Sequence, residues 1–168
     1  MAFRTSGKLL LHKTKGTSWK MPFSSAELDG IFTAMLDASG RPDACVELTL
    51  LDDGAMSELH ASALGCKGPT NVLSFPASGA SGHPFNKDRT PAPEDNHAES
   101  GSLPLGWLAL SVDTLLRESY LYGQTVEEHC LRLLAHGMAH ILGHDHGPDM
   151  DAICDLLEKA AERAAPTP

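Results

Sequence analysis

Hydrophobic residues recur along much of this chain with a helical period. Apolar residues three and four positions apart, each run preceded by a capping residue, predict five helices. Their start signals are Ser24 or Ser25, Asp52 or Asp53, Asp113, Thr125 with Glu128 in a capping box, and Pro148. The predicted ends are Gly40, about Leu64, about Tyr122, Gly143 and about Ala161. Glycine suits such ends because it adopts the left-handed conformation without strain.

Other segments have a period of two or consist of short apolar runs, which predict strands. Val46, Leu48 and Leu50 alternate with Glu47 and Thr49, as in a half-buried strand. The remaining predicted strands lie at 7–13, 71–75 and 105–112. Strands and helices mixed in this order give an α/β or α+β sandwich, in which helices cover a sheet.

Residues 77–104 show no period and are rich in Gly, Ser, Pro and Asn. They predict a long flexible loop and not a second domain. His83 and His97 fall in this segment and are expected to be solvated, because a mobile loop supports metal ligands poorly. With 168 residues, the chain is expected to form one domain over 1–168.

Composition narrows the class of protein. No apolar run approaches 18 residues and no secretory signal is visible, so a membrane partner is not expected. The four cysteines form no Cys-x-x-Cys pair and fit reduced thiols in the cytoplasm. The net charge of −9 argues against nucleic-acid binding. However, five of the 13 Lys and Arg residues lie in the first twenty positions, where they either meet phosphates or protect a strand edge.

The chemistry-bearing motif is His-x3-His-x5-His at His136, His140 and His146. Residues four apart share one helix face, so the first two imidazoles can meet at one point. Gly143 can end the helix and let the turn bring His146 to the same point. Three neutral imidazoles with one open position are typical of catalytic zinc. Asp145 is a candidate to orient a ligand imidazole by a hydrogen bond to the ring nitrogen that does not bind the metal.

Two other interpretations of this motif are weaker. In the first, the histidines bind no metal and their positive charge interacts favourably with the dipole at the C-terminal end of the helix. A third His after a helix-stopping Gly is a poor fit to such a chance arrangement. His144 in the same turn is expected to be solvated. The spacing also matches the start of the metzincin protease pattern, except that Gly137 replaces the Glu that serves as general base. A peptidase is therefore disfavoured.

At two separate motifs the chain resembles the YbeY family of bacterial rRNA maturation endoribonucleases. Residues 136–146 match its signature His-Gly-x-x-His-x-x-Gly-x-Asp-His at every fixed position, including Gly137. Residues 70–76, Thr-Asn-Val-Leu-Ser-Phe-Pro, match a second family segment. The order of elements fits from about residue 8 to about residue 163.

The resemblance implies an α+β fold, with a small mixed β-sheet covered by helices, one of which carries the metal-binding motif. It implies a cytoplasmic, single-strand-specific, metal-dependent endoribonuclease that acts on an rRNA precursor in small-subunit maturation and ribosome quality control. It also implies one zinc per chain, held by His136, His140 and His146, and contact with the small ribosomal subunit or assembly proteins.

The chain departs from the family pattern at two positions. Leu64 stands where the family usually has an Arg, and Gly106-Trp107 where it has Gly-Asp. Lys67 is close enough in sequence to replace the Arg in part as a substrate-phosphate contact, but only as a point charge. Two other functions stay open: a zinc-stabilised ribosome-assembly factor with little or no nuclease activity, and a metallohydrolase of another substrate.

Overall fold

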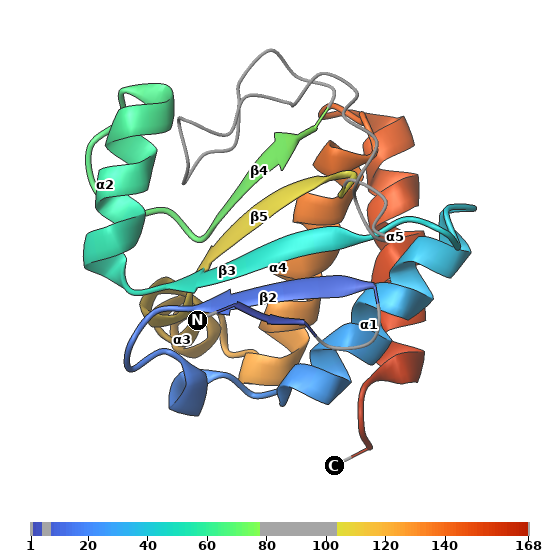
Figure 1. Cartoon of the computed structure of the whole chain (residues 1–168), viewed down its shortest axis with the longest axis horizontal. Helices are drawn as coiled ribbons and strands as arrows, with labels where there is room; N and C mark the ends of the chain where they lie inside the picture. The colour runs from blue at the N-terminus through green and yellow to red at the C-terminus, as the bar shows by residue number, and fades with distance from the viewer. Residues whose placement is uncertain (1, 5–7, 78–103, 168) are drawn as a thin grey trace, which may run out of the picture.

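The computed structural model describes residues 2–4, 8–77 and 104–167. Five strands form one mixed sheet in the order β1-β2-β3-β5-β4 (Figure 1). The strands are β1 Ala2–Arg4, β2 Leu9–Lys13, β3 Val46–Leu51, β4 Val72–Pro76 and β5 Gly106–Ser111. The three central strands, β2, β3 and β5, are parallel, and the edge strands β1 and β4 run antiparallel to their neighbours. The α+β fold with a small mixed sheet is therefore confirmed.

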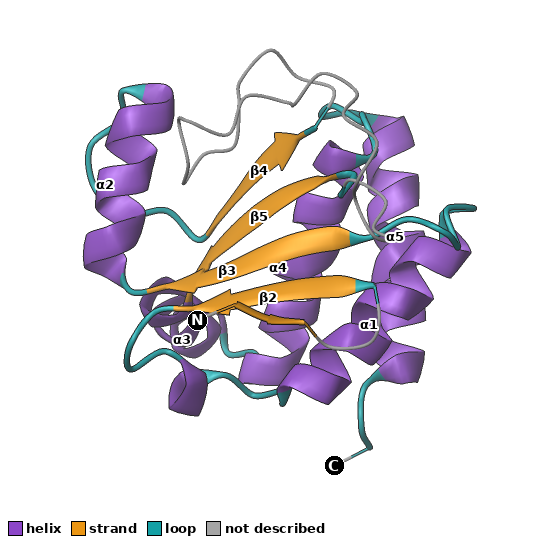
Figure 2. Ribbon diagram, viewed as in Figure 1, coloured by secondary structure: helices purple, strands orange, loops and turns teal. Residues whose placement is uncertain are grey.

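Helices cover the two faces of this sheet unequally (Figure 2). The main core lies on one face, where the sheet packs against α1 Ser25–Ala38, α4 Val126–Ile141 and α5 Pro148–Ala164. A smaller cluster on the other face is formed by Met56 and Leu59 of α2, Asp53–Leu64, with residues of β3, β4 and β5. The remaining helices are α3 Val112–Tyr122 and a short 3-10 helix η1, Ser18–Lys20. No helix in the described part of the chain is long and apolar enough to cross a membrane.

The predicted start signals place the helices well. Ser24 and Thr125 each form a complete capping box with the Glu three residues later, which satisfies backbone N–H groups that the helix leaves unpaired. Asp52, not Asp53, caps α2. The third start signal, Asp113, was misplaced, because α3 begins at Val112 and its cap is Ser111.

The prediction of a half-buried strand at β3 is wrong. All six residues of β3 are buried, including Glu47, at 4% exposure, and Thr49. Because β3 lies in the middle of the sheet, both of its faces are covered. The Glu47 carboxylate accepts a hydrogen bond from Trp107 Nε1 at 3.0 Å and lies 3.0 Å from His12 Nε2. The polar residues of the alternating pattern are thus buried with partners and do not face water.

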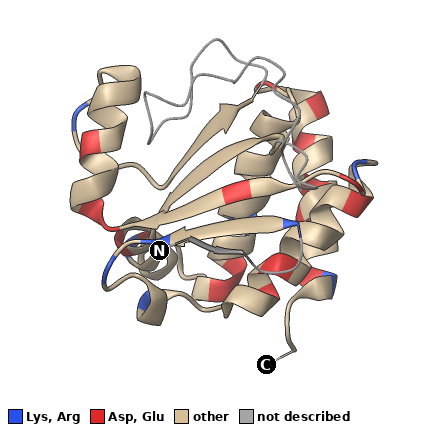
Figure 3. Ribbon diagram, viewed as in Figure 1, with Lys and Arg blue, Asp and Glu red and all other residues tan. Residues whose placement is uncertain are grey.

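The basic N-terminal residues are partly neutralised by acidic ones. Lys8 forms an ion pair with Asp37 at 2.9 Å, and Lys20 forms one with Asp113. Figure 3 shows Lys and Arg positions on several elements in this view. The predicted flexible loop lies outside the described residues except at its two ends, and so do His83 and His97.

Candidate metal centre

Helix α4 carries the first two histidines of the motif to the edge of the sheet. Its apolar face is anchored in the main core, which fixes the rotation of the helix about its axis. His136 and His140 then lie on the adjoining, half-buried face. The helix ends at Ile141, and Gly143 takes a φ of +92°, as the sequence predicts for its stop. This turn brings the exposed His146 back beside the helix.

The three imidazoles converge as the spacing predicts. The ring centroids of His136 and His140 are 4.8 Å apart. The ring centroid of His146 lies 5.7 Å from that of His136 and 5.0 Å from that of His140. One nitrogen of each ring lies within 4.8 Å of the corresponding nitrogens of the other two. In the part of the chain that the structure describes, this is the single such group of possible metal ligands, and His144 is not a member.

Hydrogen bonds on the far side of two rings favour one tautomer. His140 Nδ1 lies 3.1 Å from the backbone carbonyl oxygen of His144, so Nδ1–H donates and the Nε2 lone pair is left for a metal. His146 Nδ1 lies 3.3 Å from Asp145 Oδ1, and the backbone N–H of His146 donates to the same oxygen at 2.8 Å. These bonds from His146 hold the pKa of the Asp145 carboxyl below its usual range. The position of Asp145 therefore suits the orienting role that its sequence position suggested.

The surroundings of His136 favour its neutral, metal-binding form. Partial burial lowers the pKa of His136, and the neighbouring His140 and His146 lower it further, since two adjacent imidazolium charges repel. A metal ligand must be a neutral imidazole. His136 is therefore ready to bind a cation at a lower pH than an isolated histidine would be.

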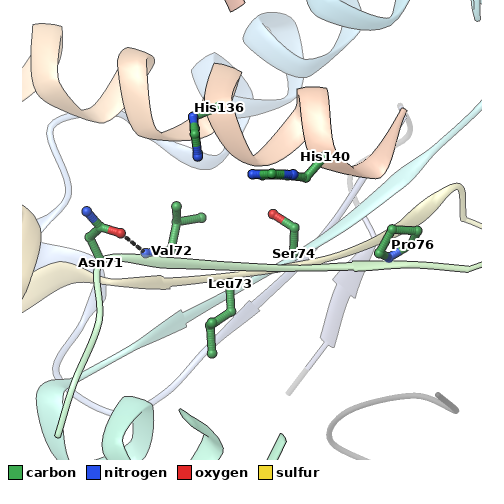
Figure 4. Close-up of a pocket in the computed structure, with 7 residues that line it drawn as sticks. All are labelled: Asn71, Val72, Leu73, Ser74, Pro76, His136 and His140. Atoms are coloured by element: carbon green, nitrogen blue, oxygen red, sulfur yellow. Dashed lines mark hydrogen bonds between the residues drawn. The ribbon is translucent and has the colours of Figure 1, made fainter. Parts of the chain in front are cut away.

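The opposite wall of the site comes from strand β4. A pocket of about 330 Å³ lies between α4 and this strand, and Figure 4 shows the two helical imidazoles facing it. The residues that line it are Asn71, Val72, Leu73, Ser74, Pro76, His136 and His140. The second sequence motif, at 70–76, is thus the wall across from the histidines of the first.

Gly137 allows this close approach of helix and strand. A Cβ at this position would lie 2.7 Å from Leu108 Cδ2, 3.2 Å from Val72 Cγ2 and 3.3 Å from Ser74 Oγ. The sequence marked Gly137 as a replaced catalytic Glu and as part of the family signature, but gave it no structural role. The structure gives it a steric role, because any side chain here would enter the helix–sheet interface.

The two family departures lie away from this pocket. Leu64 is 61% exposed at the end of α2, on the other face of the sheet, so it does not close an apolar helix face as Leu59 does. Trp107 also faces away from α4 and bonds to Glu47. Lys67 is exposed in the segment between α2 and β4 and does not line the pocket.

Sequence reasoning missed a polar network beside the pocket. Asn71 Nδ2 donates to both carboxylate oxygens of Glu118, at 3.3 and 3.1 Å, and Asn71 Oδ1 accepts from the backbone N–H of Val72. Glu118 also lies 2.8 Å from Nε2 of the buried His129. The match at 70–76 pointed to this segment, but nothing in the sequence identified its partners on α3 and α4.

Known proteins resemble this chain in sequence and in fold. The family model described as Endoribonuclease YbeY matches residues 14–162. Endoribonuclease YbeY of Nitratidesulfovibrio vulgaris is 47% identical over 160 residues, which cover 94% of each chain. That of Oleidesulfovibrio alaskensis is 42% identical over 149 residues, 87% of this chain and 88% of the relative. The solution structure of TM1509 from Thermotoga maritima is similar in fold, with a TM-score of 0.55 at 17% identity over 92% of this chain and 87% of that one.

Proposed function

The chain belongs to the YbeY endoribonuclease family, and on this premise we propose that it is a metal-dependent endoribonuclease that cleaves single-stranded RNA. We further propose that its zinc, one per chain, is held by His136, His140 and His146. The observation that carries this proposal is the convergence of the three imidazoles, with ligand nitrogens within 4.8 Å of one another, beside a pocket.

The donor set fits zinc. Three neutral imidazoles leave one coordination position open, as in catalytic and not structural zinc sites. A divalent metal there supplies Lewis-acid chemistry, because it polarises a phosphoryl oxygen and makes water more acidic. The protein's own contribution is to fix the rings: the His144 carbonyl and the Asp145 carboxylate set the tautomers of His140 and His146.

The shape of the site supports a single strand as substrate. A pocket of about 330 Å³ is the size of a small-molecule site, so it can admit a sugar and a phosphate but not a duplex. Single-stranded RNA also exposes bases and 2′-hydroxyls that a protein can contact. The space against Gly137 is filled by Leu108, Val72 and Ser74, so the general base of a zinc peptidase has no room at that position.

We place this activity in small-subunit rRNA maturation and ribosome quality control, in the cytoplasm, on the family resemblance described above. The substrate is then an rRNA precursor, and the partners are the small subunit or its assembly proteins. We also propose that residues 1–168 act as one metal-dependent ribonuclease domain.

The second candidate is a zinc-stabilised ribosome-assembly factor with little nuclease activity. Its support is electrostatic: the net charge is −9, and two of the basic N-terminal side chains are paired with carboxylates. A protein that binds RNA through its phosphates gains affinity from Lys and Arg side chains that are not paired with carboxylates. The pocket beside the histidines favours the enzyme, since a structural zinc site has its fourth position closed by protein.

Substrate class is the first test of the proposed function. The zinc-loaded protein is incubated with an unstructured oligoribonucleotide, its duplex, the DNA of the same sequence and casein. We expect cleavage of the unstructured RNA alone, abolished by a chelator and restored by zinc. Chelator-sensitive hydrolysis of casein with intact RNA would favour a peptidase instead, and zinc binding without any hydrolysis would favour the assembly factor.

Substituting Leu64→Arg is expected to raise RNA cleavage at limiting RNA concentration by about tenfold, because an Arg at this exposed helix end can hold a phosphate of the strand outside the pocket, and about 1.4 kcal/mol of added binding free energy gives that factor. A guanidinium can bind phosphate in a bidentate manner, which Lys67 cannot do. Because Leu64 is 61% exposed, the substitution buries no charge and the melting temperature should stay unchanged.

Ala61→Arg is the matched control, since it adds the same charge one turn earlier on the exposed side of α2. Cleavage rates of both variants at several salt concentrations separate a local contact from general attraction. Equal rates in the two variants would show that position 64 is not a specific phosphate site.

A further inference from the structure

We infer that Ser74 is a substrate-contacting residue, whose hydroxyl donates a hydrogen bond to a non-bridging oxygen of the scissile phosphate. The inference rests on the proposed function, because it assumes that an RNA phosphate enters the pocket between α4 and β4. It assigns a role to the strand side of the site, across from the three histidines.

The alternation of β4 directs this hydroxyl into the pocket. Side chains of a strand point to opposite faces in turn, so Val72, Ser74 and Pro76 face α4. Leu73 and Phe75 point to the other face, where they pack in the smaller core cluster. Figure 4 shows the Ser74 hydroxyl directed toward the imidazoles of His136 and His140.

Gly137 leaves the hydroxyl uncovered. A Cβ at position 137 would lie 3.3 Å from Ser74 Oγ, so a side chain on the helix would close the space above it. The same glycine that allows helix and strand to approach therefore adds no side chain between Ser74 and the pocket.

Ser74 also lacks a partner within the described residues, where no hydrogen bond of its hydroxyl is found. Other serines of the fold donate within the chain: the half-buried Ser57 donates to the Asp53 carbonyl at 2.7 Å, and the buried Ser111 donates to the Asp53 carboxylate at 2.8 Å. Since no buried polar side-chain atom in the described residues lacks a partner, the Ser74 hydroxyl must be open to solvent. A ligand in the pocket can take the place of water as its partner.

Among the side chains of the strand wall, Ser74 is the donor that remains available. Val72, Leu73 and Pro76 carry no polar side-chain atom, and the Asn71 amide is held by Glu118 and by the backbone of Val72. On the helix side, Nδ1–H of His140 is used by the His144 carbonyl. An anion in the pocket thus meets one free hydroxyl on the wall opposite the imidazoles. Hydrogen bonds to charged oxygens are among the stronger ones in proteins.

The test compares the wild type with Ser74→Ala, and uses Ser57→Ala as a control that removes a serine hydroxyl outside the pocket. Each protein is assayed for zinc content, melting temperature and cleavage of a short oligoribonucleotide with one cleavage site. We expect Ser74→Ala to keep its zinc and its melting temperature and to cleave about 10- to 100-fold more slowly, as expected for losing one hydrogen bond to a charged group. Ser57→Ala should cleave like the wild type.

A sulfur substitution then locates the contact. The same oligonucleotide is made with a phosphorothioate at the scissile position, and its two diastereomers are tested separately. If Ser74 binds one non-bridging oxygen, replacing that oxygen with sulfur slows cleavage by the wild type but has a smaller effect on cleavage by Ser74→Ala. Slower cleavage by the variant with both sulfur effects unchanged would mean that Ser74 only shapes the pocket, which overturns the contact.

Other outcomes also decide the matter. Cleavage by Ser74→Ala at the wild-type rate overturns the inference alone and leaves the proposed function intact. Loss of zinc from the variant would place Ser74 in the metal site and not on the phosphate. If the zinc-loaded wild type cleaves no RNA, the proposed function fails. The affinity for the oligonucleotide, measured by fluorescence anisotropy, then tests the Ser74 contact. Equal affinities of wild type and variant would overturn it.

Discussion

Substituting His140→Ala is expected to remove most of the bound zinc and to lower RNA cleavage by at least about 100-fold. Losing a group that merely orients a metal ligand typically costs about 10- to 100-fold in metal affinity or activity, so losing a ligand should cost more. His136→Ala should behave in the same way, because both rings meet His146 at one point. The measurements are zinc content after gel filtration and the cleavage rate at saturating zinc.

His144→Ala is the matched control for these variants. It removes an imidazole from the same turn, but the bond from His140 uses the backbone carbonyl of His144, which the substitution keeps. Zinc content and cleavage should therefore stay near wild-type values. Full zinc occupancy in His140→Ala, or a loss in His144→Ala as large as in His140→Ala, would contradict the proposed set of ligands.

Substituting Gly137→Glu, which restores the protease pattern in the sequence, is expected to destabilise the fold by more than about 3 kcal/mol. Overpacking a tight interface typically costs about 1–3 kcal/mol, and a buried charge without a partner costs about 3–5 kcal/mol. The added Cβ would already lie 2.7 Å from Leu108 Cδ2, in the fully buried core. We expect no peptidase activity, because the new carboxylate faces the sheet.

Gly30→Glu provides the control for this experiment. Gly30 also lies inside a helix, α1, but a Cβ there meets nothing within 4 Å. Removing a helical glycine at such a site should stabilise the protein by about 0.5–1 kcal/mol. Urea unfolding of both variants gives the free energies of unfolding. A Gly137→Glu protein as stable as the wild type would show that α4 can move away from β4.

Much of the fold follows from local sequence signals. The capping residues Ser24, Asp52 and Thr125 and the stop at Gly143 were predictable, because a helix end is decided by backbone groups within one turn of it. The start of α3 was misplaced by one residue, at Asp113 and not at Val112, because Ser111 and Asp113 are both residue types that favour a helix start. The full burial of β3 was not predictable, because it depends on the strands and helices on either side of it.

The convergence of the three histidines was likewise determined by the sequence itself, since their spacing follows from the pitch of one helix and one glycine turn. Only the tertiary structure decided what lies across from them. Ser74 is more than sixty residues away along the chain, and it meets the site because Gly137 lets α4 pack closely on β4. The exposure of Leu64 was decided in the same way. Periodicity reports the neighbours within one element, whereas contacts between elements depend on how their side chains pack together.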